Sequence, residues 1–239
     1  MDAGTLSQEV LERARSASDN GNWSDTAGAG LSDVRPAELE GDDARIAFWI
    51  NVYNALVRDE LARHPRSGHL LRHRRVFRDA SYEIGGERYT PDVIEHGLLR
   101  LNSRPPLGLR PPLRPGDPRF EAAPSRLDPR IHFALNCAAA SCPPIRSYWE
   151  EELDSQLELA TRSYVIAETK IDREQGTVRL PYLLKLYARD FGGKEAHLDF
   201  VIRYLPAADA AWLVEGDGFR GGVTYAGFDW TITSDLPPV

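Results

Sequence analysis

Hydrophobic positions recur along the chain at spacings typical of short amphipathic helices. In residues 5–18, Leu6, Val10 and Leu11 lie on one side, which predicts a first helix. In residues 42–63, apolar side chains lie almost all round the first three turns, as expected of a helix buried in a core. Similar patterns predict further helices at residues 90–100, 149–167, 182–191, 195–204 and 207–215.

Strands are expected in fewer places, and together they predict one small antiparallel sheet. A Gly-Gly pair between two β-prone runs is typical of a hairpin over residues 82–89. Residues 130–137 alternate between apolar and polar positions, which favours a half-buried strand, with a helix as the alternative. Other strands are expected at 177–181 and as a C-terminal pair around 226–227. The predicted fold class is α+β, mostly helical, with only a loose analogy to papain- and transglutaminase-like folds.

The 239 residues fit a single domain, in which residues 1–41 pack on a domain of residues 42–239. Residues 102–129 hold eight of the 17 prolines and predict a long extended segment, of the kind that is usually functional or inserted. Residues 19–31 are rich in small and polar side chains, and we expect a loop there that anchors Trp23.

Composition and charge narrow the classes of partner. The chain is 42% hydrophobic and 27% charged, close to an ordinary globular protein. Its formal net charge of -7 gives no gain from counterion release on nucleic acid, and an anionic membrane would repel it. We therefore expect neither partner, and an unknown small-molecule or peptide substrate or a protein partner instead. The basic residues are nearly all arginine, which together with the acidic balance permits a salt-loving source.

The predicted cellular setting is the cytoplasm. The sequence shows no signal-peptide pattern and no apolar run of about 18 residues that would span a membrane. Two cysteines are too few for a disulfide framework, so we expect both to be reduced thiols.

Cys142 is the candidate nucleophile. It lies in residues 141–144 (SCPP), where the following proline excludes helical backbone and places the thiol on an extended or turning loop. A loop thiol with a base nearby can be activated to the thiolate. His132 is the candidate base, because the alternation of residues 130–137 places it in the polar row. The alternatives are an inert buried thiol and a histidine held by structural hydrogen bonds.

Three further polar residues complete the predicted constellation. Asn51 and Asn54 lie three apart on the buried helix and share a face. They can orient a histidine, as the amide does in Cys-His-Asn enzymes, or tie the helix to a neighbouring loop. Glu95 shares a stripe with Leu98 and Leu99, which indicates an inward carboxylate that positions a substrate or forms a structural ion pair.

Other titratable residues are expected at the surface. Asp92, His96 and Arg100 are spaced four apart, which favours a surface charge ladder. The same expectation covers the histidines in polar, arginine-rich or loop contexts, which are His64, His69, His73 and His197.

No cofactor or metal site is predicted from the cysteines. The alternation places Cys137 on an apolar face, which favours a structural role. No second cysteine pair and no histidine at finger-like spacing accompany the two thiols. A set made of Glu95, His96 and His132 stays open as an alternative metal site.

Several short sequence motifs, taken in their order along the chain, resemble the domain-of-unknown-function 547 family. The blocks that carry the resemblance are Ala47–Ala55, Asp92–Arg100, Asp128–Arg146, Leu180–Gly192 and the closing Phe228-Asp229-Trp230. The resemblance spans roughly residues 42–232 and implies a single domain of unknown function. The positions at which this chain matches family members are Asn51, Asn54, Glu95, His132 and Pro143. Plant-type members carry Ser-Ser-Pro where this chain has Ser141-Cys142-Pro143, which weakens the case for an obligatory thiol mechanism.

Two functional hypotheses follow from the sequence. The first is a cysteine-dependent hydrolase or acyl transferase in which Cys142 attacks, His132 acts as base and an asparagine orients it. The second is a non-catalytic binding or scaffold module, in which the same polar residues form a buried structural network. A pocket that joins Cys142 and His132 would favour the first, and an exposed apolar patch the second.

Overall fold

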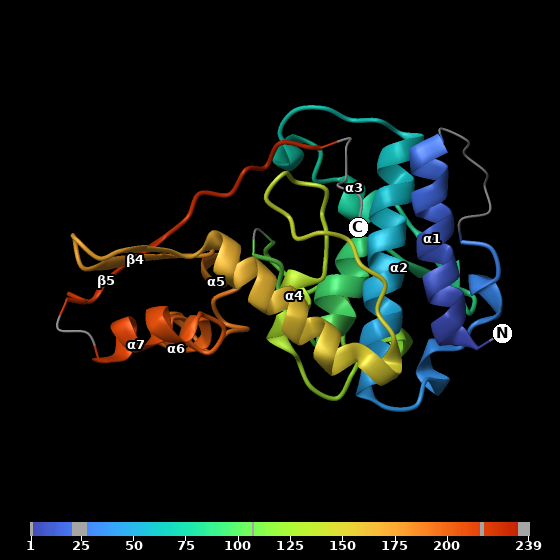
Figure 1. Cartoon of the computed structure of the whole chain (residues 1–239). Helices are drawn as coiled ribbons and strands as arrows, with labels where there is room; N and C mark the ends of the chain where they lie inside the picture. The colour runs from blue at the N-terminus through green and yellow to red at the C-terminus, as the bar shows by residue number, and fades with distance from the viewer. Residues whose placement is uncertain (1, 21–27, 107, 216–217, 234–239) are drawn as a thin grey trace. The chain divides into compact units, whose positions relative to one another are not determined.

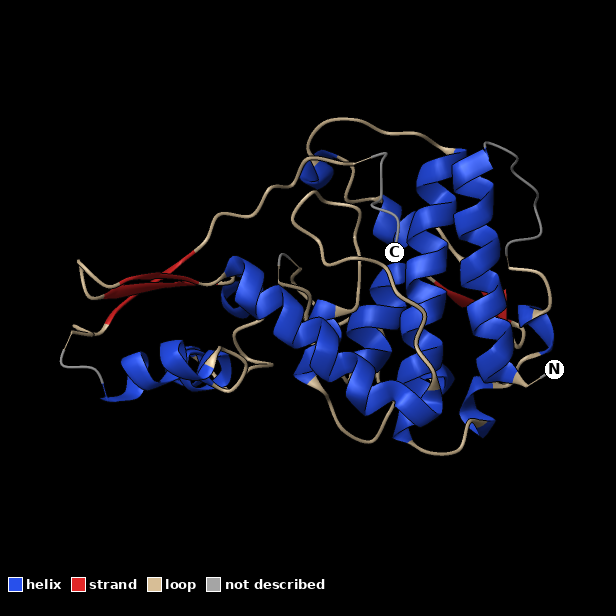
Figure 2. Ribbon diagram, viewed as in Figure 1, coloured by secondary structure: helices blue, strands red, loops and turns tan. Residues whose placement is uncertain are grey.

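Helices make up most of the regular structure of the chain (Figure 2). The computed structural model describes residues 2–20, 28–106, 108–215 and 218–233. The loop expected around Trp23 lies outside them. Within the described part of the chain, no helix combines the length and apolar character needed to cross a bilayer.

The chain divides into two compact units, one of residues 1–156 with 229–239 and the other of residues 157–228. The prediction of a single domain over the whole chain stays a prediction. The fold class is confirmed: the protein is mostly helical, with a small antiparallel sheet and a separate three-stranded sheet.

The first unit is built from short helices around one long one. In chain order its elements are α1 (Ala3–Asn20), η1 (Leu31–Asp33), η2 (Pro36–Glu38), α2 (Asp42–Arg63), η3 (Leu70–Arg72), α3 (Val76–Asp79), β1 (Tyr82–Ile84), β2 (Glu87–Tyr89), η4 (Val93–Leu99), η5 (Pro118–Ala122), η6 (Pro129–Phe133), η7 (Glu150–Glu152) and the start of α4 (Leu153–Glu168).

Helix α2 is the core of this unit. Asp42 and Asp43 in its first turn and Arg63 in its last suit the helix dipole. Its side chains are buried without a break from position 46 to position 59, so the helix is enclosed on every face. Helix α1 packs alongside α2 (Figure 1). Both predicted helices, at 5–18 and 42–63, are confirmed.

The hairpin predicted over residues 82–89 is also confirmed. β1 and β2 pair antiparallel, with Glu83 opposite Arg88. Gly85 and Gly86 form the turn with φ of 60° and 82°, the two positive values that a twisted two-residue hairpin turn requires.

The strand predicted at residues 130–137 is wrong. Residues Pro129–Phe133 form the 3-10 helix η6, because the Asp128 carboxylate accepts the Arg130 N–H at 2.9 Å and Pro129 occupies the first helical position. Every residue from 131 to 136 is buried. The alternation of apolar and polar residues in this stretch therefore does not correspond to a buried face and an exposed face.

The helix predicted at residues 90–100 exists, but its central part is the π-helix η4. Backbone bonds run from Arg100 N–H to Glu95 C=O and from Asn102 N–H to Gly97 C=O, five residues apart. Such segments are rare and often mark functional sites. Every residue of η4 is buried, so this turn presents no exposed face.

The proline-rich segment 102–129 is tied to the core rather than extended freely. Asn102 makes two hydrogen bonds with the backbone of Leu113, both 3.1 Å long. The indole N–H of Trp49 donates to the Ala122 C=O at 2.9 Å, and the Trp49 ring packs on Tyr89.

The second unit combines a small sheet with short helices. Its elements are the rest of α4, then β3 (Lys170–Asp172), β4 (Thr177–Leu180), α5 (Tyr182–Leu186), η8 (Lys194–Ala196), α6 (His197–Ile202), α7 (Ala207–Glu215) and β5 (Gly222–Tyr225). β3 pairs antiparallel and β5 pairs parallel with β4. The strand at 177–181 is thus confirmed.

The strand pair predicted around 226–227 is wrong. β5 pairs with β4, and the following residues 229–233 pair within the first unit instead, through single bridges from Thr231 to His69 and from Ile232 to Ala139. Both segments of the expected hairpin pair with strands or bridges that are distant in sequence, and a local sequence pattern does not predict such pairing.

Candidate thiol site

The two cysteines lie side by side on the loop that follows η6. Their sulfur atoms are 2.8 Å apart, and the Cys137 backbone N–H donates to the Cys142 Sγ at 3.3 Å. Both are free thiols and both are half-buried. The structure therefore places Cys137 in contact with the predicted nucleophile.

The Asn136 side chain holds this loop in its folded form. Its Oδ1 accepts the Ala138 N–H and its Nδ2 donates to the Pro143 C=O, both at 2.7 Å. Asn136 is buried. Its two hydrogen bonds connect the residue that follows Cys137 to the residue that follows Cys142, and so hold the two sulfurs close together.

Ala138 between the cysteines has left-handed backbone, with φ of 67°. This region costs a residue with a Cβ about 1–2 kcal/mol. Its methyl group is fully buried. Backbone strain held in place by surrounding structure is a recurring feature of functional sites.

A segment near the C-terminus covers one edge of the loop. We call residues 229–233 the strap. The N–H groups of Ala140 and Ser141 donate to strap carbonyls at 2.9 and 3.3 Å, and the Ser141 hydroxyl accepts the Asp229 N–H at 2.9 Å. On its other edge the strap bonds to the backbone of residues 68 and 70. The cysteine loop is thus a strand-like edge fixed by long-range pairing.

The surroundings of the two thiols shift their pKa values in opposite directions. Burial raises the pKa of Cys142, but hydrogen bonds from the Cys137 thiol and from the backbone N–H groups of Cys137 and Ala139 outweigh it, and the net pKa is lowered. The hydrogen bond to Cys142, together with burial, raises the pKa of Cys137 well above its ordinary value. Cys142 is the thiol that ionises first.

Glu95 lies close enough to act on both thiols. Its negative charge raises the pKa of Cys142 and of Cys137, as the smallest of the causes that act on each thiol. Glu95 and Cys142, two of the residues predicted for the site, therefore interact through their charges.

The surface charge ladder expected at Asp92, His96 and Arg100 is wrong. His96 and Arg100 are buried, because the core encloses the whole of η4 and the residue that follows it. Arg100 Nη1 lies 2.9 Å from His96 Nδ1. A guanidinium can only donate, so the Nδ1 atom of His96 is the acceptor in this contact. Glu95 Oε1 lies 3.5 Å from the same Nδ1.

Asp92 is the partly buried acid at the start of this turn. Burial and the neighbouring Glu95 carboxylate raise the pKa of Asp92 to about 7, against an opposing effect of Arg78. The carboxyl groups of Asp92 and Glu95 thus repel each other.

Both predicted asparagines bind backbone. Asn54, which is fully buried, accepts the Asn136 N–H at 2.9 Å and donates to the Ala134 C=O at 3.0 Å. Asn51 makes the same pair of bonds with the backbone of Tyr148, each 2.9 Å long. The two amides clamp both ends of the segment that carries the cysteine loop onto α2.

His132 is buried on η6, four residues before Asn136. The surface placement expected for His197 is wrong. This ring is fully buried in the second unit, in edge contact with Phe191 and Tyr225, and its Nδ1 lies 2.8 Å from the Tyr225 hydroxyl. Burial lowers the pKa of His197. Within the described residues, no group of three or more His, Cys, Asp or Glu side chains is arranged to hold a metal ion.

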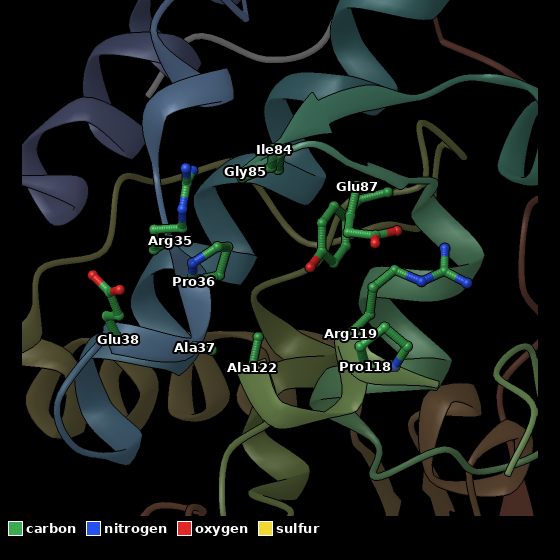
Figure 3. Close-up of a pocket in the computed structure, with 11 residues that line it drawn as sticks. Arg35, Pro36, Ala37, Glu38, Ile84, Gly85, Glu87, Pro118, Arg119 and Ala122 are labelled. Carbon is green, nitrogen blue, oxygen red and sulfur yellow. The ribbon is translucent and has the colours of Figure 1, made fainter. Parts of the chain in front are cut away.

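A pocket of about 170 Å³ opens in another part of the first unit, between η2, the β1–β2 hairpin and η5 (Figure 3). Its rim carries the charged side chains Arg35, Glu38, Glu87 and Arg119. None of the residues predicted for the site lines it. The pocket and the thiol pair are separate features.

Sequence reasoning missed Cys137 and Asn136 as parts of the site. Four residues separate Cys137 from Cys142, and this short spacing is the sequence signal that indicates a thiol pair. Asparagine two residues before a left-handed position is typical of a side chain that bonds its own turn, and this signal was also present.

These observations define a helix-rich α+β protein with a paired-thiol loop clamped onto a buried helix. The model of the family described as protein of unknown function, DUF547, matches residues 36–165, more than half of the chain. The chain belongs to this family. The matched residues include α2, η4 and the cysteine loop, whereas the blocks at 180–192 and 228–230 lie outside. None of the curated proteins and none of the solved structures matches the chain.

Proposed function

We propose that this protein is a cysteine-dependent hydrolase or acyl transferase with Cys142 as its nucleophile. The observation that supports the proposal is the setting of one sulfur atom: the Cys142 Sγ accepts the Cys137 backbone N–H at 3.3 Å and contacts the Cys137 Sγ at 2.8 Å. Donors aimed at a sulfur stabilise its anionic form, which is the reactive one.

The reaction that we propose has two stages. The Cys142 thiolate attacks the carbonyl carbon of a small-molecule or peptide substrate, and a C–S bond forms as the leaving group departs. Water or a second nucleophile then cleaves the thioester and restores the thiolate. In this proposal His132 is the base that takes the Cys142 thiol proton and returns it to the leaving group, and Glu95 orients the groups beside the sulfur.

In this proposal the two asparagines do not contact the substrate and act by positioning the backbone of the cysteine loop. Because Asn54 bonds the backbone on both sides of Leu135, it fixes the position of the loop that starts at Asn136. Asn51 fixes the chain after the loop at Tyr148. Both are positioning residues, and their loss would displace Cys142 without touching a substrate.

The test is the pH dependence of alkylation of each thiol in the folded, reduced protein, read by peptide mass spectrometry. We expect Cys142 to react with an apparent pKa below the free-thiol value of about 8.5, and Cys137 to react above it. The Cys137→Ala variant removes one donor and should raise the apparent pKa of Cys142. Thiols that both ionise at or above the free value would refute the proposal.

A second measurement addresses acyl transfer itself. Incubation with activated acyl esters should leave one acyl group on Cys142, seen by intact mass, and none on a Cys142→Ala variant. The His132→Ala variant should form or release this adduct more slowly. A reactive Cys142 that is never acylated by any ester would retain the nucleophile and remove the acyl-transfer assignment.

The binding-module hypothesis is favoured by a different observation. Leu109 and Phe120 on the proline-rich segment are 91% and 44% exposed. Exposed apolar side chains on a proline-rich loop are the chemistry that recognises a protein partner. A double Leu109→Ser and Phe120→Ser variant that loses a partner while Cys142 keeps its reactivity would support this second function.

A further inference from the structure

The pair Cys137 and Cys142 is placed for chemistry that acyl transfer does not use. With the sulfur atoms 2.8 Å apart, a small closing movement brings them to the bonded distance of about 2.05 Å. The Asn136 hydrogen bonds and the left-handed turn at Ala138 already hold the backbone of the intervening residues in a closed loop. The backbone therefore needs little rearrangement for a bond between the two sulfurs.

The backbone donors of the loop point to the same chemistry. Here the N–H groups of Ala140 and Ser141 donate to the strap, and that of Cys142 donates to the Ala139 C=O. Exchange between thiols and disulfides needs only an attacking thiolate, a second thiol and access to the first sulfur.

We propose that Cys142 and Cys137 form a redox-active dithiol that exchanges with low-molecular-weight disulfides. The inference rests on the nucleophilic Cys142 of the proposed function but not on acyl transfer. The Cys142 thiolate attacks one sulfur of the disulfide, forms a mixed disulfide and expels the first thiolate. The Cys137 thiol loses its proton, attacks the Cys142 sulfur and expels the second. The dithiol gives two electrons and two protons, and the small disulfide becomes two thiols.

The surroundings of each sulfur decide which cysteine attacks first and which one resolves the mixed disulfide. Cys142 accepts two backbone N–H groups and the Cys137 thiol, so it carries the negative charge. Cys137 is the group that donates to it and keeps its proton until the mixed disulfide removes that charge. Oxidation would also inactivate the acyl chemistry, because the disulfide has no free nucleophile at Cys142.

The experiment incubates the full-length reduced protein with excess oxidised glutathione and follows intact mass and cysteine-containing peptides with time. The wild-type protein should lose the mass of two hydrogen atoms, yield a linked 137–142 peptide and hold no lasting glutathione. The Cys137→Ser variant should stop at one glutathione on Cys142. The Cys142→Ser variant should react at least about tenfold more slowly, because Cys137 keeps its proton.

The outcomes separate this inference from the proposed function. A wild-type protein that accumulates glutathione on Cys142 without closing the disulfide overturns the dithiol and leaves the nucleophile in place. Protein that stays fully reduced while Cys142 is readily alkylated does the same. Thiols that resist both reagents until urea unfolds the chain overturn both ideas. Thermal unfolding of the serine variants near the wild-type temperature shows that each one is folded.

Discussion

Two regions of the first unit hold polar side chains among apolar ones, and they use them in opposite ways. On α2, the amides of Asn51 and Asn54 are fully buried, and each accepts from and donates to backbone. On the cysteine loop, the two thiols are half-buried, contact each other and flank a strained residue. The two asparagines thus hold the backbone in place, whereas the two thiols, among the residues that the structure describes, keep their reactive atoms free of backbone carbonyl partners.

The α2 side of this comparison is broken most severely by Asn54→Ala. The substitution leaves the Asn136 N–H and the Ala134 C=O buried without partners, at about 1–3 kcal/mol each. Alanine returns a few tenths of a kcal/mol of helix propensity, so we expect a loss of about 2–5 kcal/mol in the free energy of unfolding. Urea denaturation measures it.

Gln156→Ala is the matched control for that substitution. Its side-chain oxygen also accepts a backbone N–H, from Trp149, but in an exposed setting. The control should lose about 0.5 kcal/mol or less, because water replaces the lost partner. Equal losses in the two variants would mean that the buried amide is not the anchor that its bonds indicate.

The loop side is tested by Asn136→Ala. Loss of the bonds to Ala138 and Pro143 should cost about 1–3 kcal/mol and let the sulfurs separate. The apparent pKa of Cys142 in alkylation should then rise towards the free-thiol value. Asn136→Asp keeps the acceptor for the Ala138 N–H but places a buried carboxylate against the Pro143 C=O, so it should raise the Cys142 pKa at least as much as alanine does. An unchanged Cys142 pKa in both variants would show that Asn136 does not position the thiol.

Local signals predicted the parts of the fold that depend on local causes. The acidic residues at positions 42 and 43 and the proline at position 65 delimit α2, and its continuous apolar surface marks burial. A Gly-Gly pair is nearly obligatory for the tight turn at Gly85, because both positions need positive φ. These elements were predictable because one short stretch contains the whole reason for each.

The site was less predictable because it depends on long-range pairing and an unusual backbone. No rule places an alanine in left-handed geometry, yet the position of Ala138 decides whether the two sulfurs meet. The strap reaches the loop from nearly a hundred residues away in sequence. The Asp128-Pro129 start signal was readable for η6, but a chance alternation of apolar and polar residues outweighed it.

A third prediction concerns Asp92, the acidic residue at the start of η4. The folded protein holds the pKa of Asp92 at about 7, above its unfolded value, so the native state retains a proton that the unfolded chain loses. Wild-type stability should therefore fall as pH rises from about 4 to 7, by on the order of 2 kcal/mol once solvent screening is discounted. Asn in place of Asp92 removes the ionisable group, and urea melts at several pH values would show this.

The comparison between Asp92→Asn and wild type has a definite sign. The variant should match the wild-type protein near pH 4 and exceed its stability above pH 7, because only the wild-type carboxylate is forced to ionise in a buried setting. Parallel pH profiles for the two proteins would show that Asp92 is ionised and well solvated throughout.

The smallest expected effect probes the strain at Ala138 directly. Glycine there removes the left-handed penalty of about 1–2 kcal/mol but loses a buried methyl group and adds unfolded-state freedom, at about 0.8 and 0.4–1 kcal/mol. These contributions nearly cancel, so Ala138→Gly should lie within about 0.5 kcal/mol of wild type. Ala139 is also buried but has ordinary backbone, and Ala139→Gly meets the same costs without relief, so it should lose about 1–2 kcal/mol. Equal losses at both positions would mean that the turn between the cysteines stores no strain, and that Asn136 and the strap alone hold the two sulfurs together.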